Sequence, residues 1–360
     1  MPLETPLLEL HRSAHAEIAE YFGTLLPSTF GDFSAEYSAA RNAVALVDTN
    51  FRALFAFSGP DAQRYLNAIL TSNVRDLKAG QGTVGLLLNP QGHILAEVET
   101  FLREASILAS SHAMVRERTF ATFDKFIIMD DVTLEDVTPV TCTLDMVGPR
   151  ASALISELCG VKLEDMTILG HQEVAVGAIP CRIVRREWAG TASATLIVTL
   201  EQLVPLWNAL DERVRAHGGM PAGMEALNSI RLESGTPWFG NDYDDKNIPH
   251  EAGLEHSHIS YEKGCYTGQE IVERVRSRGH VNRRLTPLIF LAAEHPIPGA
   301  KLFTANMPNP VEVGAVTSTA FSPLLQGPIG LGYVRREHSA VGNRLDASGV
   351  PTEVISLSSN

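Results

Sequence analysis

A strand that ends in Gly-Pro and leads into an amphipathic helix occurs twice in the chain, 89 positions apart. In the first copy, residues 51–57 alternate as a strand does and the Gly-Pro pair at 59–60 ends it. The helix that follows has apolar residues at the spacing of a core-facing stripe. In the second copy, residues 142–146 alternate, Gly-Pro lies at 148–149, and the stripe keeps its phase relative to the glycine. A chance match of a common pattern is the alternative, but the shared phase favours an internal duplication.

Each copy continues with two further strands and a second helix. The predicted strands are residues 86–88 and 94–102 in the first copy and residues 181–188 and 194–199 in the second; the second helices lie near residues 114–126 and after Thr199. Thr199 with Gln202 three residues later is typical of a capping box at a helix start. The sequence therefore predicts two duplicated units of the order strand–helix–strand–strand–helix, an α+β pattern of the ferredoxin-like kind.

The C-terminal part of the chain has a different sequence pattern from the two copies of the repeat. A helix is predicted from about Gly223 to Glu233, where Gly235 and Pro237 end it. Beyond Leu285, short β-rich runs alternate with proline and glycine: residues 288–291, 311–317, 329–334 and 353–357. Short strands with frequent turn residues predict a small antiparallel barrel.

Composition limits the class of protein. A length of 360 residues suits two or three domains. The net charge of −13 argues against nonspecific binding of nucleic acid through the whole surface. No apolar run approaches the roughly 18 residues of a membrane span, and the N-terminus lacks a signal-peptide pattern. The four cysteines are widely spaced, which fits a reducing compartment. We therefore expect a cytoplasmic protein without a nucleic-acid or membrane partner.

The segment Lys263–Glu270 (Lys-Gly-Cys-Tyr-Thr-Gly-Gln-Glu) is the strongest candidate for chemistry. Thr267 and Glu270 predict a capping box for a helix that runs from Gln269 to about Arg278. Cys265 would then lie two residues before the N-cap, where the helix dipole and the charge of Lys263 favour a thiolate. The glycines at 264 and 268 would allow a ligand to approach the backbone closely. A buried structural cysteine in a glycine-containing turn is the alternative.

Two other sets of residues near this segment are candidates for binding. The first is a local basic patch: Arg274, Arg276, Arg278, Arg283 and Arg284. Such a patch suits phosphates or carboxylates, although arginines near a helix C-terminus also complement the dipole. The second set is His250, His256 and His258, which together with Cys265 could hold a metal. No second cysteine or H-x-x-x-H pair accompanies them, so ordinary loop histidines are favoured and no metal is predicted.

Lys263–Glu270 resembles the K-G-C-[FY]-x-G-Q-E signature of YgfZ-type folate-binding proteins, which are implicated in iron–sulfur cluster assembly and repair. Nearly the whole chain is similar to the wider aminomethyltransferase superfamily, that of the glycine cleavage T-protein (GcvT). The segments that carry this likeness are residues 231–235 (L-R-x-E-x-G helix), 249–254 (P-x-E-A-G-L), 314–318 and 322–323 (G-x-V-T-S…S-P).

The resemblance implies an α+β fold, a three-domain GcvT-like ring with two duplicated ferredoxin-like units and a C-terminal antiparallel β-barrel. The expected domains are residues 1–50 with 141–248, which form a first folate-binding unit; residues 51–140; and residues 249–360, which carry the cysteine motif and the barrel.

The resemblance also implies a cofactor and partners. Tetrahydrofolate or a derivative would bind, and Cys265 would be the reactive or ligating group in iron–sulfur assembly or repair, with iron–sulfur proteins or assembly factors as partners. The expected folate-binding residues are Lys263, Tyr266, Gln269, Glu270, Arg276 and Arg283. One alternative is a tetrahydrofolate-dependent aminomethyltransferase; a second is a noncatalytic interaction protein that has lost folate.

Three positions depart from the family pattern. The transferase signature G-G-I-x-D-D aligns with residues 92–97, which puts Ala96 where the family has its catalytic Asp. Glu97 is adjacent, but neighbouring residues of a strand point to opposite faces. The family's pterin-recognising Glu falls on Thr191 and its folate-contacting Arg on Leu227. Aminomethyl transfer would therefore lack its carboxylate.

Overall fold

The computed structural model describes residues 2–188, 190–305 and 307–357. The chain divides into two compact units. The first unit comprises residues 1–87, 96–227 and 260–264, and the second comprises residues 88–95, 228–259 and 265–360. Within the described part of the chain, no helix is both long enough and apolar enough to cross a membrane.

The first copy of the repeat forms a five-stranded sheet. Its elements are β5 (Arg52–Ser58), α3 (Ala62–Ile69), β6 (Gly82–Leu88), β7 (Ile94–Leu102), β8 (Ile107–His112), α4 (Arg116–Phe126) and β9 (Thr133–Asp136). The strands lie in the order β6-β7-β8-β5-β9. The predicted helices and the strands that flank the turn at 89–92 are all present.

The second copy repeats this order of elements. Its elements are β10 (Thr141–Val147), α5 (Ala151–Cys159), β11 (His171–Val176), β12 (Ile179–Trp188), β13 (Thr191–Thr199), α6 (Leu200–Ala216) and β14 (Met220–Pro221). The strands lie in the order β11-β12-β13-β10-β4-β14, where β4 is Ala45–Asp48. The first four strands of this sheet match the first four of the other, position by position, as a duplication requires.

Each copy contains two strands more than the sequence pattern indicated. In the first copy these are β8, whose residues are all buried, so it shows no alternation, and the short β9. In the second copy they are β11, whose burial does not alternate, and the two-residue β14. The capping box predicted at α6 is also wrong, since Thr199 is the N-cap but its side chain makes no capping hydrogen bond.

The N-terminal fifty residues add elements that the sequence pattern did not predict. They are β1 (Leu3–Glu4), α1 (Leu8–Ser13), β2 (Glu17–Tyr21), β3 (Thr24–Thr29), α2 (Phe33–Asn42) and β4. Asp32 caps α2 by accepting a hydrogen bond from the Ala35 amide at 3.0 Å. The fully buried Glu36 accepts from the Gly223 amide at 2.8 Å, which connects α2 to the chain after β14.

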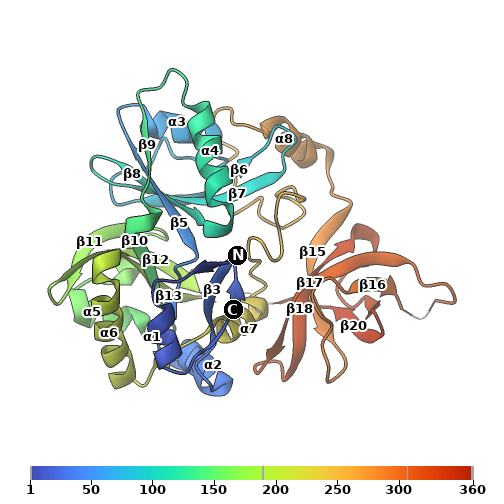
Figure 1. Ribbon diagram of the computed structural model, residues 1–360. Coiled ribbons are helices and arrows are strands. Elements are labelled where there is room, and N and C mark those ends of the chain that lie inside the picture. The colour runs from blue at the N-terminus through green and yellow to red at the C-terminus, as the bar shows by residue number, and fades with distance from the viewer. Residues whose placement is uncertain (1, 189, 306, 358–360) are drawn as a thin grey trace. The chain divides into compact units, whose positions relative to one another are not determined.

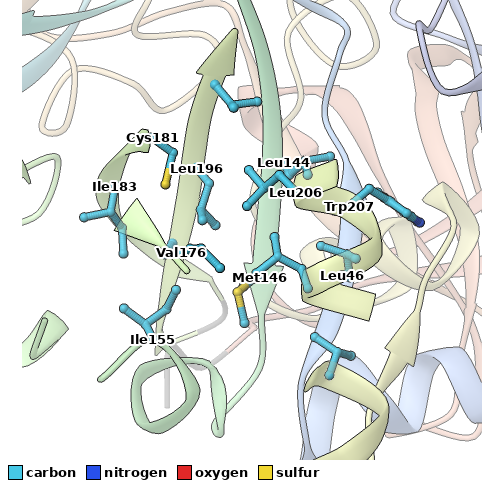
Figure 2. Close-up of a cluster of buried hydrophobic side chains, with 14 of the residues drawn as sticks. Leu46, Leu144, Met146, Ile155, Val176, Cys181, Ile183, Leu196, Leu206 and Trp207 are labelled. Carbon is cyan, nitrogen blue, oxygen red and sulfur yellow. The ribbon is translucent and has the colours of Figure 1, made fainter. Parts of the chain in front are cut away.

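Helices α5 and α6 pack against the second sheet and form the largest part of its core with it (Figures 1 and 2). Figure 2 shows Leu144 and Met146 of β10 between side chains of the two helices, with Ile155 from α5 and Trp207 from α6. These positions carry the predicted stripes. Burial of such apolar side chains is the main favourable contribution to folding.

The second unit contains a closed six-stranded barrel, which confirms the predicted C-terminal barrel. Its strands are β15 (Arg283–Phe290), β16 (Lys301–Thr304), β17 (Glu312–Ser322), β18 (Gly327–Arg335), β19 (Arg344–Ala347) and β20 (Val350–Val354), in the order β15-β18-β17-β16-β19-β20. All ladder pairs are antiparallel. The interior is apolar, with Leu288, Leu302 and Val334 fully buried. The α+β class is confirmed with it.

Two buried carboxylates join helix α7 (Met224–Glu233) and the loop that follows it to this barrel. Asp242 accepts from the Arg231 guanidinium at 2.5 Å and from the hydroxyls of Thr317 and Ser318 at 2.5 and 2.7 Å. Glu233 accepts from the Ser322 hydroxyl at 2.6 Å. The family-like segments at 231–235, 314–318 and 322–323 therefore meet in two buried sets of hydrogen bonds, one around each carboxylate.

Candidate functional site

Cys265 is the exposed member of the four cysteines. Cys142 and Cys181 are buried, and this burial raises the pKa of Cys142 to about 12 and that of Cys181 to about 11. Cys159 is partly buried and its pKa is raised for the same reason. Because a thiol must be accessible and deprotonated to react, Cys265 is the candidate nucleophile or ligand of this chain.

The helix after Cys265 starts differently from the prediction. Helix α8 (Gln269–Arg278) ends at Gly279 as expected, but its N-cap is Gly268, in a left-handed conformation with φ of 83°. No side chain caps the helix, so the predicted capping box of Thr267 and Glu270 is wrong. Cys265 accordingly lies three residues before the N-cap rather than two.

Gly268 takes this place because the backbone packs closely against the turn between β6 and β7. A Cβ atom on Gly268 would lie 2.7 Å from the carbonyl oxygen of Asn89 and 3.3 Å from Cα of Gly92. A Cβ atom on Gly92 would in turn lie 2.9 Å from Cβ of Ile271. Gly268 thus allows close backbone packing against the turn at residues 89–92. No local sequence pattern indicates that this turn is the neighbour of Gly268.

Gly264 differs from Gly268. Apart from its two chain neighbours, no described residue has an atom within 4 Å of the position that a Cβ would take on Gly264, and its φ is not in the left-handed region. Close packing in the protein therefore does not require a glycine at 264. The close approach of a ligand to Gly264 stays a prediction.

Lys263 is buried, and its ammonium faces main-chain carbonyls. It donates to the carbonyl oxygens of Asn67 and Leu70, at the end of α3, and to that of Ser72 at 3.0 Å. Burial, with a smaller contribution from Arg75, lowers the pKa of Lys263 to about 8. Lys263 therefore donates hydrogen bonds to the carbonyls at the end of α3. The sequence pattern instead predicts that its charge stabilises the thiolate of Cys265.

The other residues of the motif surround the start of α8. Tyr266 is buried, Gln269 is half-buried and Glu270 is exposed in the first helical turn. An acidic residue there interacts favourably with the helix dipole. Folate contacts of these three residues stay predictions.

The arginine patch contains internal ion pairs. Arg276 is exposed and lies 3.4 Å from Glu273 on the same helix. Arg283 lies 3.0 Å from Glu251 and stacks over Tyr333 at 4.8 Å. Arg274 and Arg284 are exposed, and the side chain of Arg278 is outside the described residues. The predicted folate contacts of Arg276 and Arg283 would have to compete with these carboxylates.

Ala96, which the resemblance aligns with the transferase carboxylate, is fully buried on β7. Glu97 and Glu99 share the other face of the strand, as their spacing predicts. Glu99 lies 3.0 Å from Arg52 and 2.8 Å from Arg186. Burial alone would raise the pKa of Glu99, but the two guanidinium groups outweigh it and lower the pKa.

His112 lies beside Glu97, with 4.0 Å between Nε2 and Oε1. Burial lowers the pKa of His112 to about 4, so its imidazole is neutral at pH 7. The buried charge cluster of Arg52, Glu99 and Arg186, with His112 beside it, was not found from the sequence, because its members come from separate strands and match no short motif.

The two family positions for pterin recognition carry other groups in this chain. Thr191 is half-buried at the start of β13, and Leu227 is buried in α7. A threonine hydroxyl and an aliphatic side chain provide neither a carboxylate nor a guanidinium. The residues at these positions therefore do not fit the family's pterin contacts.

No group of three or more His, Cys, Asp or Glu side chains suited to a metal ion occurs among residues 2–188, 190–305 and 307–357. His258 Nδ1 lies 2.7 Å from the hydroxyl of Ser257. Burial lowers the pKa of His250.

Comparison with known proteins connects the whole chain to one family. The model described as "GCVT N-terminal domain" matches residues 7–260, and "Glycine cleavage T-protein C-terminal barrel domain" matches residues 283–354. Aminomethyltransferase from Thermoanaerobacter sp. (strain X514) is 24% identical, with 99% of this chain and 96% of the relative covered. Aminomethyltransferase from Desulforamulus reducens is 27% identical, with 95% and 92% covered.

A solved structure shows the same fold. The crystal structure of glycine cleavage system aminomethyltransferase T from Bartonella henselae matches with a TM-score of 0.87 and 24% identity, over 100% of this chain and 98% of that one. The repeat, the barrel and the order of the elements are therefore those of this fold.

Proposed function

Because this chain belongs to the family of the glycine cleavage T-protein, with its N-terminal and C-terminal barrel domains, we propose that it binds tetrahydrofolate or a derivative and acts through Cys265. The single observation that carries the choice of Cys265 is the fully buried alanine at 96, the position that the resemblance aligns with the carboxylate of the transferase reaction. The exposed thiol of Cys265 is the remaining reactive group of the family-like motifs.

The finer proposal is support for the assembly or repair of iron–sulfur clusters. The likeness of Lys263–Glu270 to the YgfZ-type signature supports it. The exposure of Cys265 supports it as well, because cysteine thiolates are the ligands of iron–sulfur clusters. Iron–sulfur proteins or assembly factors would be the partners.

Replacing Cys265 by Ala is expected to lower the activities of iron–sulfur enzymes severalfold in cells that depend on this protein. The expected cause is the loss of the thiolate, which is the nucleophile and ligand in cysteine chemistry. Enzymes without clusters serve as the internal reference, and Cys159→Ala is the matched variant, because that thiol is half-buried and its pKa is raised. Equal activities in Cys265→Ala and wild-type cells would reject this role.

Aminomethyl transfer to tetrahydrofolate is the second candidate, and the names of the relatives favour it. The discriminating assay mixes the purified protein with aminomethyl-loaded lipoyl carrier protein and tetrahydrofolate and measures methylene-tetrahydrofolate. We expect turnover at least about a hundredfold below that of a family transferase, because the loss of one preorganised electrostatic group costs about 10²–10³ in rate. Turnover close to the transferase rate would establish the second candidate.

Folate binding itself is tested by calorimetry with tetrahydrofolate. Saturable binding is expected, and it should persist in Cys265→Ala if the thiol acts on a partner rather than on the folate. A flat titration would remove tetrahydrofolate from the proposal and favour a protein that kept the fold without the ligand, as Thr191 and Leu227 suggest.

A further inference from the structure

Lys263 places a positive charge at the C-terminal end of α3. Three carbonyl oxygens, those of Asn67, Leu70 and Ser72, accept hydrogen bonds from its ammonium, and the lysine is 8% exposed. The last carbonyls of a helix have no partner within the helix, and the negative end of the dipole favours a cation there. An ammonium provides three protons from one point, which matches three converging carbonyls.

The segment that Lys263 contacts is itself firmly held. Thr71 exchanges hydrogen bonds with Leu86 of β6: its amide donates to the Leu86 carbonyl at 3.1 Å, and its hydroxyl accepts from the Leu86 amide at 2.7 Å. The amide of Ser260 donates to the carbonyl of Thr71 at 2.9 Å. Residues 260–263 are therefore attached to the end of α3 at two points, one through the backbone and one through the lysine.

We propose that Lys263 is a positioning residue, which fixes the backbone entering Cys265 by holding the C-terminal end of α3. The cysteine follows two residues later, so the direction in which the chain leaves this anchor constrains where the thiol lies. A neutral side chain of similar length would leave buried carbonyls without donors, which costs free energy at that point. The proposal rests on the proposed function only in treating Cys265 as the working group.

The test compares Lys263→Met with the wild-type protein in two measurements on purified, folate-free samples. The first is hydrogen exchange followed by peptide mass spectrometry. We expect exchange in residues 67–72 and 260–264 to rise about tenfold or more, while that of α5 stays unchanged, because the loss of the cap opens this region locally. The second is the rate of alkylation of Cys265 against pH, read on its own peptide. The midpoint of that profile is expected to stay where it is, while its plateau rate changes severalfold because the thiol is no longer held in one position; an unchanged plateau rate would reduce Lys263 to a structural cap and overturn the proposal.

Controls separate positioning from other roles. Lys246→Met removes the same charge from a lysine whose side chain is 82% exposed, and it should change neither measurement. Lys263→Arg, which keeps donors and charge, should restore much of the protection. If Lys263→Met does not fold, Lys263→Gln, which keeps two N–H donors, takes its place.

Two further outcomes would overturn the proposal. A higher alkylation midpoint with unchanged exchange would favour thiolate stabilisation by Lys263, and unchanged exchange with an unchanged midpoint would reject any role of the lysine in holding this segment. Neither measurement depends on iron–sulfur activity, so failure of this proposal is distinguishable from failure of the proposed function.

Discussion

Replacing Asp242 by Ala is expected to lower the free energy of unfolding by about 3–5 kcal/mol, because a buried arginine would lose its counter-charge. Arg231 and Asp242 are each 1% exposed and lie 2.5 Å apart. The hydroxyls of Thr317 and Ser318 would lose their acceptor in the same step. Equilibrium urea denaturation followed by fluorescence measures the loss.

The matched control is an exposed ion pair on the same barrel. Lys301 and Glu312 lie 2.8 Å apart, with both side chains about half exposed. Glu312→Ala is expected to cost about 0–1 kcal/mol. If Asp242→Ala costs no more than Glu312→Ala, the buried network is not what holds α7 and its loop to the barrel, and the family-like segments do not stabilise the fold in this way.

Gly268→Ala is expected to destabilise the start of α8 by about 2–5 kcal/mol. The left-handed backbone costs a residue with a Cβ about 1–2 kcal/mol, and forcing atoms into a packed contact costs about 1–3 kcal/mol. The contact is with the carbonyl of Asn89, at 2.7 Å from the added Cβ. Because backbone cannot yield as a flexible side chain does, the helix start or the turn must shift. Hydrogen exchange in α8 and in residues 88–95 should rise, and the thermal midpoint should fall.

The same motif contains the control. Gly264→Ala adds the same methyl group where, among the residues that the structure describes beyond the two chain neighbours, no atom lies within 4 Å, and where φ is not left-handed. It should change the thermal midpoint and the exchange of α8 little. If the two variants lose the same stability, the close packing of Gly268 on the turn is not the reason for its glycine. If Gly264→Ala alone reduces folate binding, the prediction of a ligand near Gly264 gains support.

Much of the fold followed from local pattern. The two Gly-Pro breaks and the helical stripes identified the repeat because the same periodicity recurs in α3 and α5, and Pro and Gly marked the strands of the barrel. Strand β8 was missed because it is buried on both faces, and β11 because its burial does not alternate. The short strands β9 and β14 were missed as well. The domain boundaries stay a prediction.

The site was less predictable than the fold. Helix α8 was predicted and ends at Gly279 as expected, but its predicted start was wrong, and the role of Cys265 stays a prediction. The error at Thr267 and the role of Lys263 have a common cause: each depends on a segment far away in sequence, the turn at 89–92 for Gly268 and the end of α3 for the lysine. The capping pattern at Thr267 and Glu270 cannot reveal that the backbone of residues 89–92 packs against the start of α8.

The two sheets differ in one neighbour: β5 of the first copy pairs with β9, whereas the equivalent β10 of the second copy pairs with β4. This difference affects how the chain folds during synthesis. In the first copy, β9 pairs with β5 from within the same repeat, so this sheet can close soon after residue 136 leaves the ribosome. In the second copy, β10 pairs with β4, whose residues 45–48 were made before the whole first copy. Strand β4 therefore stays without its partner β10 until the whole first copy has been synthesised. Long-range pairings of this kind are slow to form and expose strand edges meanwhile. The edge of β4 therefore stays exposed on the nascent chain longer than the edges of the first copy.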